Sequence, residues 1–97
     1  AVIFESATTL YVSATFDSTN NKIVIAFRDA SNSGHGTAIV GTVSGTSISF
    51  GSAAVFESAS TSYVSVTYDS TNGKTVVSYQ DGGNSDYGTA VVGTVNI

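Results

Sequence analysis

Short apolar runs alternate along the chain with clusters of small polar residues. The runs are rich in Val, Ile, Tyr, Phe and Thr, and the clusters between them consist mostly of Asn, Gly, Asp and Ser. Such runs are typical of β-strands and such clusters of turns. In the first half of the chain the pattern predicts four strands, at residues 11–16, 23–28, 37–43 and 47–56, the last with an allowed break at Gly51.

The second of these strands is apolar on both of its faces. Its sequence "IVIAF" does not alternate, and "TVVSY" later in the chain and the third-strand pieces "AIV" and "AVV" behave alike. A strand buried on one face only would alternate between apolar and polar residues. The pattern therefore predicts a sheet that is covered on both sides.

The chain repeats itself with a shift of 52 residues. This register places Phe4 on Phe56 and Tyr11 on Tyr63, and 26 of the 45 overlapping pairs are identical without a gap. The turn sequences "DSTNN" and "DSTNG" coincide, with Asp to cap the backbone and Asn or Gly to adopt positive φ. Two repeats follow, at residues 1–52 and 53–97, and the second is truncated because it lacks the counterpart of "TSISFGS" at 46–52.

An all-β fold of β-propeller type is the fold that this repeat predicts. The pattern fits a propeller blade, because each repeat has four short strands and a sheet covered on both faces. The period of 52 residues is slightly above that of familiar blade repeats. Two blades cannot close a ring, since known propellers have about four to eight or more. We therefore expect two four-stranded blade repeats per chain and closure by a homo-oligomer, preferably six blades from three chains.

The N-terminal "AVIFES" has the sequence of a fourth strand without its own blade. If Ala1–Glu5 completes the second blade of another chain, each open edge is covered by the next subunit. This predicts strand exchange between copies. The alternative is a fragment or an internally truncated chain, whose open edges favour aggregation.

Charge and composition narrow the choice of partners. The net charge is −4, and the three cations, Lys22, Arg28 and Lys74, are far apart, so we expect no nucleic acid partner. No apolar run approaches the roughly 18 residues of a membrane span, and we expect no membrane partner. The chain has no Cys, which excludes disulfides and thiolate chemistry. A surface of Ser, Thr, Asn and Gly favours a secreted, cell-surface or virion protein over a cytoplasmic one.

In plan, the chain resembles the short bacterial fucose-binding lectins, whose two-repeat chains trimerise into a six-bladed propeller. The resemblance covers chain length, the two repeats and the polar surface, and it implies a lectin-like homotrimer. Those lectins bind sugar with Trp, Arg and Glu, whereas this chain has no Trp and a single Arg. No site residue is carried over.

Candidate ligand-binding residues lie in loops that we expect at one end of the blades. In a four-stranded blade, the loops at 28–36 and 80–88 emerge beside the loops that lead to the first strand of a blade, which we expect at 4–11 and 56–63. Carboxylates and amides accept hydrogen bonds from vicinal hydroxyls, and Tyr or His offers a flat surface, so the expected ligand is a carbohydrate. The candidates are Glu5, Arg28, Asp29, Asn32, His35, Glu57, Gln80, Asp81, Asn84, Asp86 and Tyr87.

Four of these candidates also have a purely structural interpretation. Asp29, Asp81, Asn32 and Asn84 recur in both repeats at turn-like positions, where such side chains bond to the backbone. Turn formation is the favoured role for them. His35, the single His, is expected as a solvated loop residue.

Catalysis and metal binding are not expected. "DSTNN" lacks the further carboxylates of a calcium loop, and no "G-x-S-x-G" elbow accompanies His35. We therefore expect no cofactor, no metal and no enzyme activity. The leading hypothesis is a non-enzymatic, self-assembling propeller that binds glycans at several sites, which would add strength by avidity. The alternatives are a purely structural or engineered repeat scaffold without a natural ligand, and a surface of Thr and Ser that binds ice.

Overall fold

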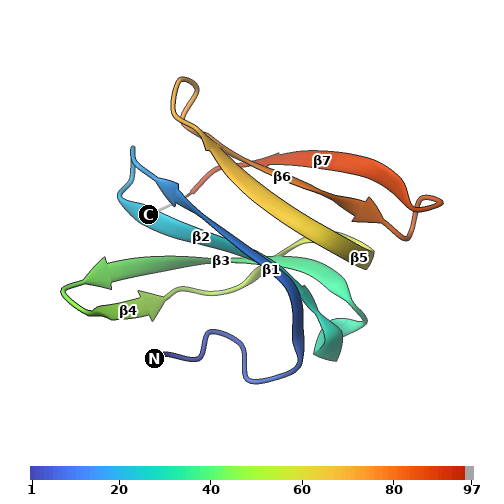
Figure 1. Ribbon diagram of the computed structural model, residues 1–97, viewed down its shortest axis with the longest axis horizontal. Coiled ribbons are helices and arrows are strands. Elements are labelled where there is room, and N and C mark those ends of the chain that lie inside the picture. The colour runs from blue at the N-terminus through green and yellow to red at the C-terminus, as the bar shows by residue number, and fades with distance from the viewer. Residues whose placement is uncertain (96–97) are drawn as a thin grey trace.

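The protein is an all-β chain, seen here in a computed structural model that describes residues 1–95. Asn96 and Ile97, the end of the predicted second repeat, lie outside the described residues. One antiparallel open sheet has the order β1-β2-β3-β5-β6-β7, and β4 pairs with β3 beside this path (Figure 1). The strands are β1 (Thr9–Asp17), β2 (Lys22–Asp29), β3 (His35–Ser44), β4 (Ser47–Phe50), β5 (Ala54–Asp69), β6 (Lys74–Asp81) and β7 (Tyr87–Gly93), with a single 3-10 turn η1 (Ala30–Asn32) among residues 1–95.

The first three predicted strands are confirmed, and the fourth is divided. Strands β1, β2 and β3 contain the predicted ranges 11–16, 23–28 and 37–43. The predicted range 47–56 is interrupted after Phe50, so the expected break at Gly51 is present. Its last residues, from Ala54, belong instead to β5.

The prediction of a loop at 56–63 is wrong, because these residues form the middle of the long strand β5. Pairing with β3 includes Ser60 opposite His35, and pairing with β6 begins at Thr61 opposite Asp81. The backbone therefore passes from one partner strand to the next without a turn. A bulge follows at Tyr63, whose φ of 53° is uncommon outside glycine.

This passage of β5 joins the two repeats into one sheet and folds the sheet over itself. Strands β5–β7 lie across β1–β3 (Figure 1). The Ser13 hydroxyl accepts a hydrogen bond from the Val66 backbone N–H at 3.3 Å, and the Tyr11 and Tyr63 rings lie 4.9 Å apart. The two repeats thus stack as layers within one open sheet.

Strand β2 lies between two apolar layers, as the sequence predicts. Val24, Ile25, Ala26 and Phe27 are all buried. Because neighbouring residues of a strand point to opposite faces, Ala26 belongs to one cluster and Ile25 and Phe27 to another. The first contains Ala26 with Val64, Val66, Val77 and Tyr79 of the second repeat, and the second contains Ile25, Phe27 and Ile39 packed with Phe4, Ile23 and Phe50.

Strand β6, the counterpart of β2, does not follow the same prediction. Thr75, Val77 and Tyr79 are buried, whereas Ser78 is exposed and Gln80 is only half-buried. One face of the strand packs on the first repeat, and nothing among residues 1–95 covers the other. The expectation that "TVVSY" is covered on both sides is therefore wrong for the single chain.

The two equivalent hairpin turns are held by aspartates. Asp17 accepts hydrogen bonds from the backbone N–H groups of Thr19 and Asn20, both at 3.0 Å, and from the Asn20 amide at 2.9 Å. Burial raises the pKa of Asp17, but these hydrogen bonds outweigh burial and lower it below its ordinary value. The side-chain amide and backbone N–H of Asn72 lower the pKa of Asp69 in the same way. Both carboxylates thus serve as turn caps.

Candidate functional site

The β2–β3 loop and the β6–β7 loop lie at the same end of the sheet (Figure 1). We call residues 28–36 and 80–88 the loop rim. The backbone N–H of Ala30 donates to the Thr8 carbonyl at 3.2 Å, and that of Gly82 donates to the Ser60 carbonyl at 2.7 Å. The predicted proximity of the loops to residues 4–11 and 56–63 is therefore confirmed, although 56–63 is a strand.

Asp29 and Asp81 are turn-forming residues. Asp29 caps η1 and accepts from the backbone N–H and the hydroxyl of Ser31, at 3.0 and 2.6 Å. The Asp81 carboxylate accepts from the Gly83 backbone N–H at 2.9 Å. Each Asp is 8 % exposed. Carboxylates this buried and this occupied by their own loops are poorly placed for a ligand, which confirms the structural interpretation for this pair.

Arg28 connects the loop rim of the first repeat to the second repeat. Its guanidinium packs against Gly34, where an added Cβ would lie 2.9 Å from Nε. Its Nη1 donates to the Ser62 hydroxyl at 3.3 Å, and its Nε is buried without a hydrogen-bond partner. The side chain is thus engaged at the contact between the two layers.

Glu57 is also engaged inside the molecule. The Tyr79 hydroxyl donates to its carboxylate at 2.9 Å. Burial of the phenol, together with this hydrogen bond and the charge of Glu57, raises the pKa of Tyr79 to about 12. The phenol therefore stays protonated at neutral pH and acts as a donor that holds Glu57.

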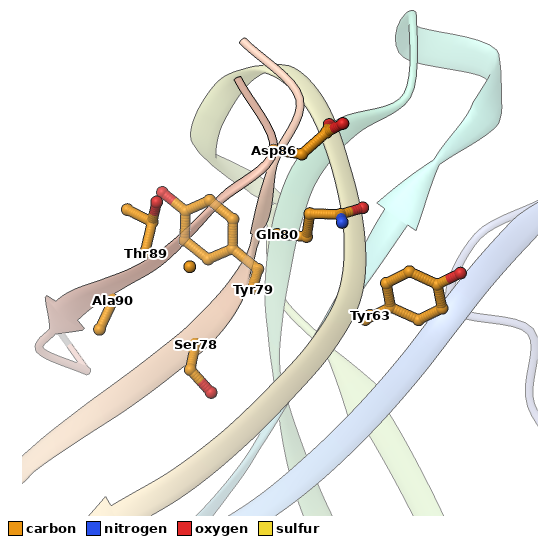
Figure 2. A pocket seen from close by; sticks show the side chains of 8 residues that line it. Tyr63, Ser78, Tyr79, Gln80, Asp86, Thr89 and Ala90 are labelled. Carbon is orange, nitrogen blue, oxygen red and sulfur yellow. The ribbon is translucent and has the colours of Figure 1, made fainter. Parts of the chain in front are cut away.

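An open depression of about 580 Å³ lies over the uncovered face of the second repeat. Figure 2 shows the Gln80 amide and the Asp86 carboxylate pointing in the same direction, with the Tyr63 ring nearby. Tyr63 is 67 % exposed. The remaining lining comes from β6 and β7 and consists of Ser78, Tyr79, Gly88, Thr89 and Ala90. Its volume is in the range of small-molecule sites.

The equivalent region of the first repeat is filled. A Cβ added to Gly36 would lie 2.6 Å from two carbons of the Phe56 ring and 3.0 Å from the Thr61 hydroxyl. At Gly88, the counterpart of Gly36, an added Cβ would meet nothing within 4 Å. The two repeats therefore do not present two equal sites in one chain.

Of the predicted site residues, only Gln80 and Asp86 line the depression. Asn32, Asn84 and Tyr87 are exposed on the loop rim, and Glu5 is half-buried. The expectation that His35 is a solvated loop residue is wrong, because His35 begins strand β3 and is half-buried. The prediction missed Tyr63, although it ends the segment 56–63 that was expected beside the loops, and it missed Ser78 and Thr89, which lie just outside the range 80–88. The signal available for Ser78 was the polar residue itself, which stands where the first repeat has Ala26.

Within residues 1–95, no group of three or more His, Asp or Glu side chains is arranged to hold a metal ion. The same residues include no helix long and apolar enough to cross a membrane. No protein-family model, curated protein or solved structure matches the chain.

Proposed function

We propose that this chain is a non-enzymatic, self-assembling β-module whose copies stack head to tail, closing into a ring that acts as a structural scaffold. The support comes from the way the two repeats contact each other inside the chain. One face of the first repeat packs against the opposite face of the second. A contact between two different faces is not self-complementary, so another molecule can make it again on the face of the second repeat that stays uncovered.

The main support for this proposal is that equivalent residues of the two repeats differ in burial. Ala26 is 0 % exposed, whereas its counterpart Ser78 is exposed. Gly36 is buried and Gly88 is exposed. On the same face, Val92 of β7 is 63 % exposed. The residues of the second repeat that correspond to the covered layer of the first repeat are thus uncovered.

Three copies, giving six blades, are the closure that we propose. A head-to-tail contact produces a closed ring if the rotation per repeat divides the circle, and an open filament if it does not. Six lies within the range of blade numbers found in propellers. In such a ring every second repeat would be covered by the first repeat of the next copy.

Solution mass tests this proposal. We expect light scattering to give about 29 kDa, three times the 9.8 kDa of one chain. The Ala26→Arg variant places a charge inside the intrachain contact, and the loss of folding expected there is the control. Ser78→Arg places the same charge on the uncovered face. Ser78→Arg should remain folded by circular dichroism but lose the oligomer. A wild-type chain of 9.8 kDa at all concentrations contradicts the proposal.

Glycan binding is the second candidate function, and the depression over Ser78 and Gln80 favours it. An exposed Tyr63 ring offers a stacking surface, and the Gln80 amide and Asp86 carboxylate supply hydrogen-bond partners for hydroxyls. This is the chemistry that a monosaccharide requires. The same surface cannot hold both a sugar and the next copy, since residues 56–62 fill the equivalent place on the first repeat.

The two functions make opposite predictions for the depression. If it is a sugar site, a glycan array should give binding that Asp86→Ala reduces about tenfold or more, which corresponds to roughly 1.4 kcal/mol or more. Asn32→Ala, an exposed change in the other loop of the rim, is the matched control. Assembled rings with no signal on the array would contradict the glycan function and leave the scaffold function in place.

A further inference from the structure

Strand β7 and the N-terminal segment both have backbone groups without a strand partner. Strand β7 pairs with β6 on one side only, and its other edge is open within residues 1–95. Residues 1–5 form no strand. Two of their apolar side chains, Val2 and Ile3, are 51 % and 78 % exposed. An open strand edge is a template for pairing with another segment.

Residues 1–5 pack on the first repeat in the same way as their counterparts, residues 53–57, pack on the second. The Phe4 ring lies 5.2 Å from the Phe27 ring at an interplanar angle of 63°. Its counterpart Phe56 lies 5.3 Å from Tyr79 at 64°. Phe4 and Phe56, like Phe27 and Tyr79, are related by the shift of 52 residues. Both segments therefore have the same position relative to the sheet that follows them.

Within the chain, the start of β5 has a strand edge to pair with, and residues 1–5 have none. The start of β5 pairs with the outer edge of β3, with Ala54 opposite Ala38 and Val55 opposite Thr37. The shift of 52 residues converts Ala38 into Ala90 of β7 and Ala54 into Val2. No residue of the same chain occupies that position beside β7 among residues 1–95.

The geometry points to a second copy of this chain as the partner of β7, with residues 2–5 of that copy forming the missing antiparallel strand. This inference rests on the proposed head-to-tail stacking and gives it a register. Val2 lies opposite Ala90, Ile3 opposite Thr89 and Glu5 opposite Gly88 of the neighbouring copy. These pairs are the intrachain pairs of β3 and β5 moved by one repeat.

Gly88 provides an independent reason for this arrangement. On β3, Gly36 is the position against which the Phe56 ring packs, with no room for a Cβ. Gly88 is glycine too, has open space around it and does not adopt positive φ. Nothing within residues 1–95 explains a glycine there. The Phe4 ring of the neighbouring copy, placed as Phe56 is placed, would pack against it.

Cysteine cross-linking tests the register, since the chain contains no Cys. We expect the double variant Val2→Cys with Ala90→Cys to form disulfide-linked multimers on a non-reducing gel after mild oxidation. The Ala38→Cys with Ala54→Cys variant has the same pairing inside one chain and should form an intrachain disulfide. Ile3→Cys with Ala90→Cys is shifted by one residue, which turns the side chains to opposite faces, and should give at least about tenfold less multimer.

The outcomes separate this inference from the proposed function. Multimers from the Val2 pair, but not from the shifted Ile3 pair, support the register. If the wild type has the mass of a ring and the intrachain control forms its disulfide, but the Val2 pair does not link, the register is overturned and stacking remains. A wild-type chain that stays single overturns both.

The Gly88→Ala variant tests the same inference without cysteines. The added methyl has room in the single chain, so the secondary structure should be unchanged by circular dichroism. In the assembly it would meet Phe4 of the neighbouring copy, and we expect the chain concentration for half-assembly to rise about tenfold or more. An unchanged concentration would overturn the placement of Phe4 on Gly88.

Discussion

Replacing Phe27 with Ala is expected to produce the largest loss of stability of any single substitution considered. Phe27 is 0 % exposed and is the largest fully buried side chain. Its ring contacts the Phe4 ring edge-on and packs with Ile25 and Ile39. Truncation removes these contacts and leaves a cavity, which costs about 3–5 kcal/mol in free energy of unfolding. A domain of this size has a stability of only about 5–15 kcal/mol.

Thermal unfolding followed by circular dichroism measures this effect. At about 4–8 °C per kcal/mol for a domain of this length, the midpoint should fall by roughly 12 °C or more. Phe16→Ala is the matched control because Phe16 is 49 % exposed, and it should change the midpoint much less. All variants must be compared at one chain concentration, since the proposed assembly would make the midpoint depend on concentration. Equal midpoints for the two variants would show that Phe27 is not central to the fold.

The sequence predicted the strands well because local patterns determine them. Runs of β-branched and aromatic residues, and the Asp-capped turns at residues 17–22 and 69–74, are short-range features. The two-sided burial of β2 was also predictable, since "IVIAF" is apolar at consecutive positions. The repeat then identified which segments of the two halves correspond.

The sequence did not predict the course of β5, because pairing determines it. Residues 56–63 contain Ser, Ala and Thr without Gly, Pro or Asn, so no local signal marks either a turn or a strand. Their conformation follows from hydrogen bonds, such as the one from the Thr61 backbone N–H to the Gly34 carbonyl at 3.0 Å. Those contacts depend on the arrangement of distant strands.

The same limit applies to the candidate site. Polar loop residues were easy to select, but Asp29 and Asp81 turned out to be occupied by their own loops. The depression instead takes much of its lining from strands, including Ser78 and Thr89. A sequence repeat shows which residues are equivalent. It does not show that one equivalent face is covered and the other open, because that depends on how the two repeats pack on each other.

The Gly36→Ala variant should test whether the layer contact inside the chain is as tight as the structure indicates. Gly36 does not adopt positive φ, so Ala is compatible with the backbone, and only space is at issue. The new methyl would lie 2.6 Å from the Phe56 ring, which is itself packed edge-on against Tyr79. The ring must move, and such overpacking costs about 1–3 kcal/mol.

Chemical denaturation of Gly36→Ala and Gly51→Ala separates the cost of a steric clash from the general effect of replacing Gly with Ala. At Gly51 an added Cβ meets only the Val40 carbonyl oxygen at 4.0 Å, and the residue does not adopt positive φ. Gly51→Ala should therefore match or slightly exceed the wild type, because Ala restricts the unfolded chain. Gly36→Ala should unfold at a clearly lower denaturant concentration. If Gly36→Ala were as stable as Gly51→Ala, the Phe56 ring would have room to move, and the contact from which the assembly is proposed would be looser than the proposed stacking of copies requires.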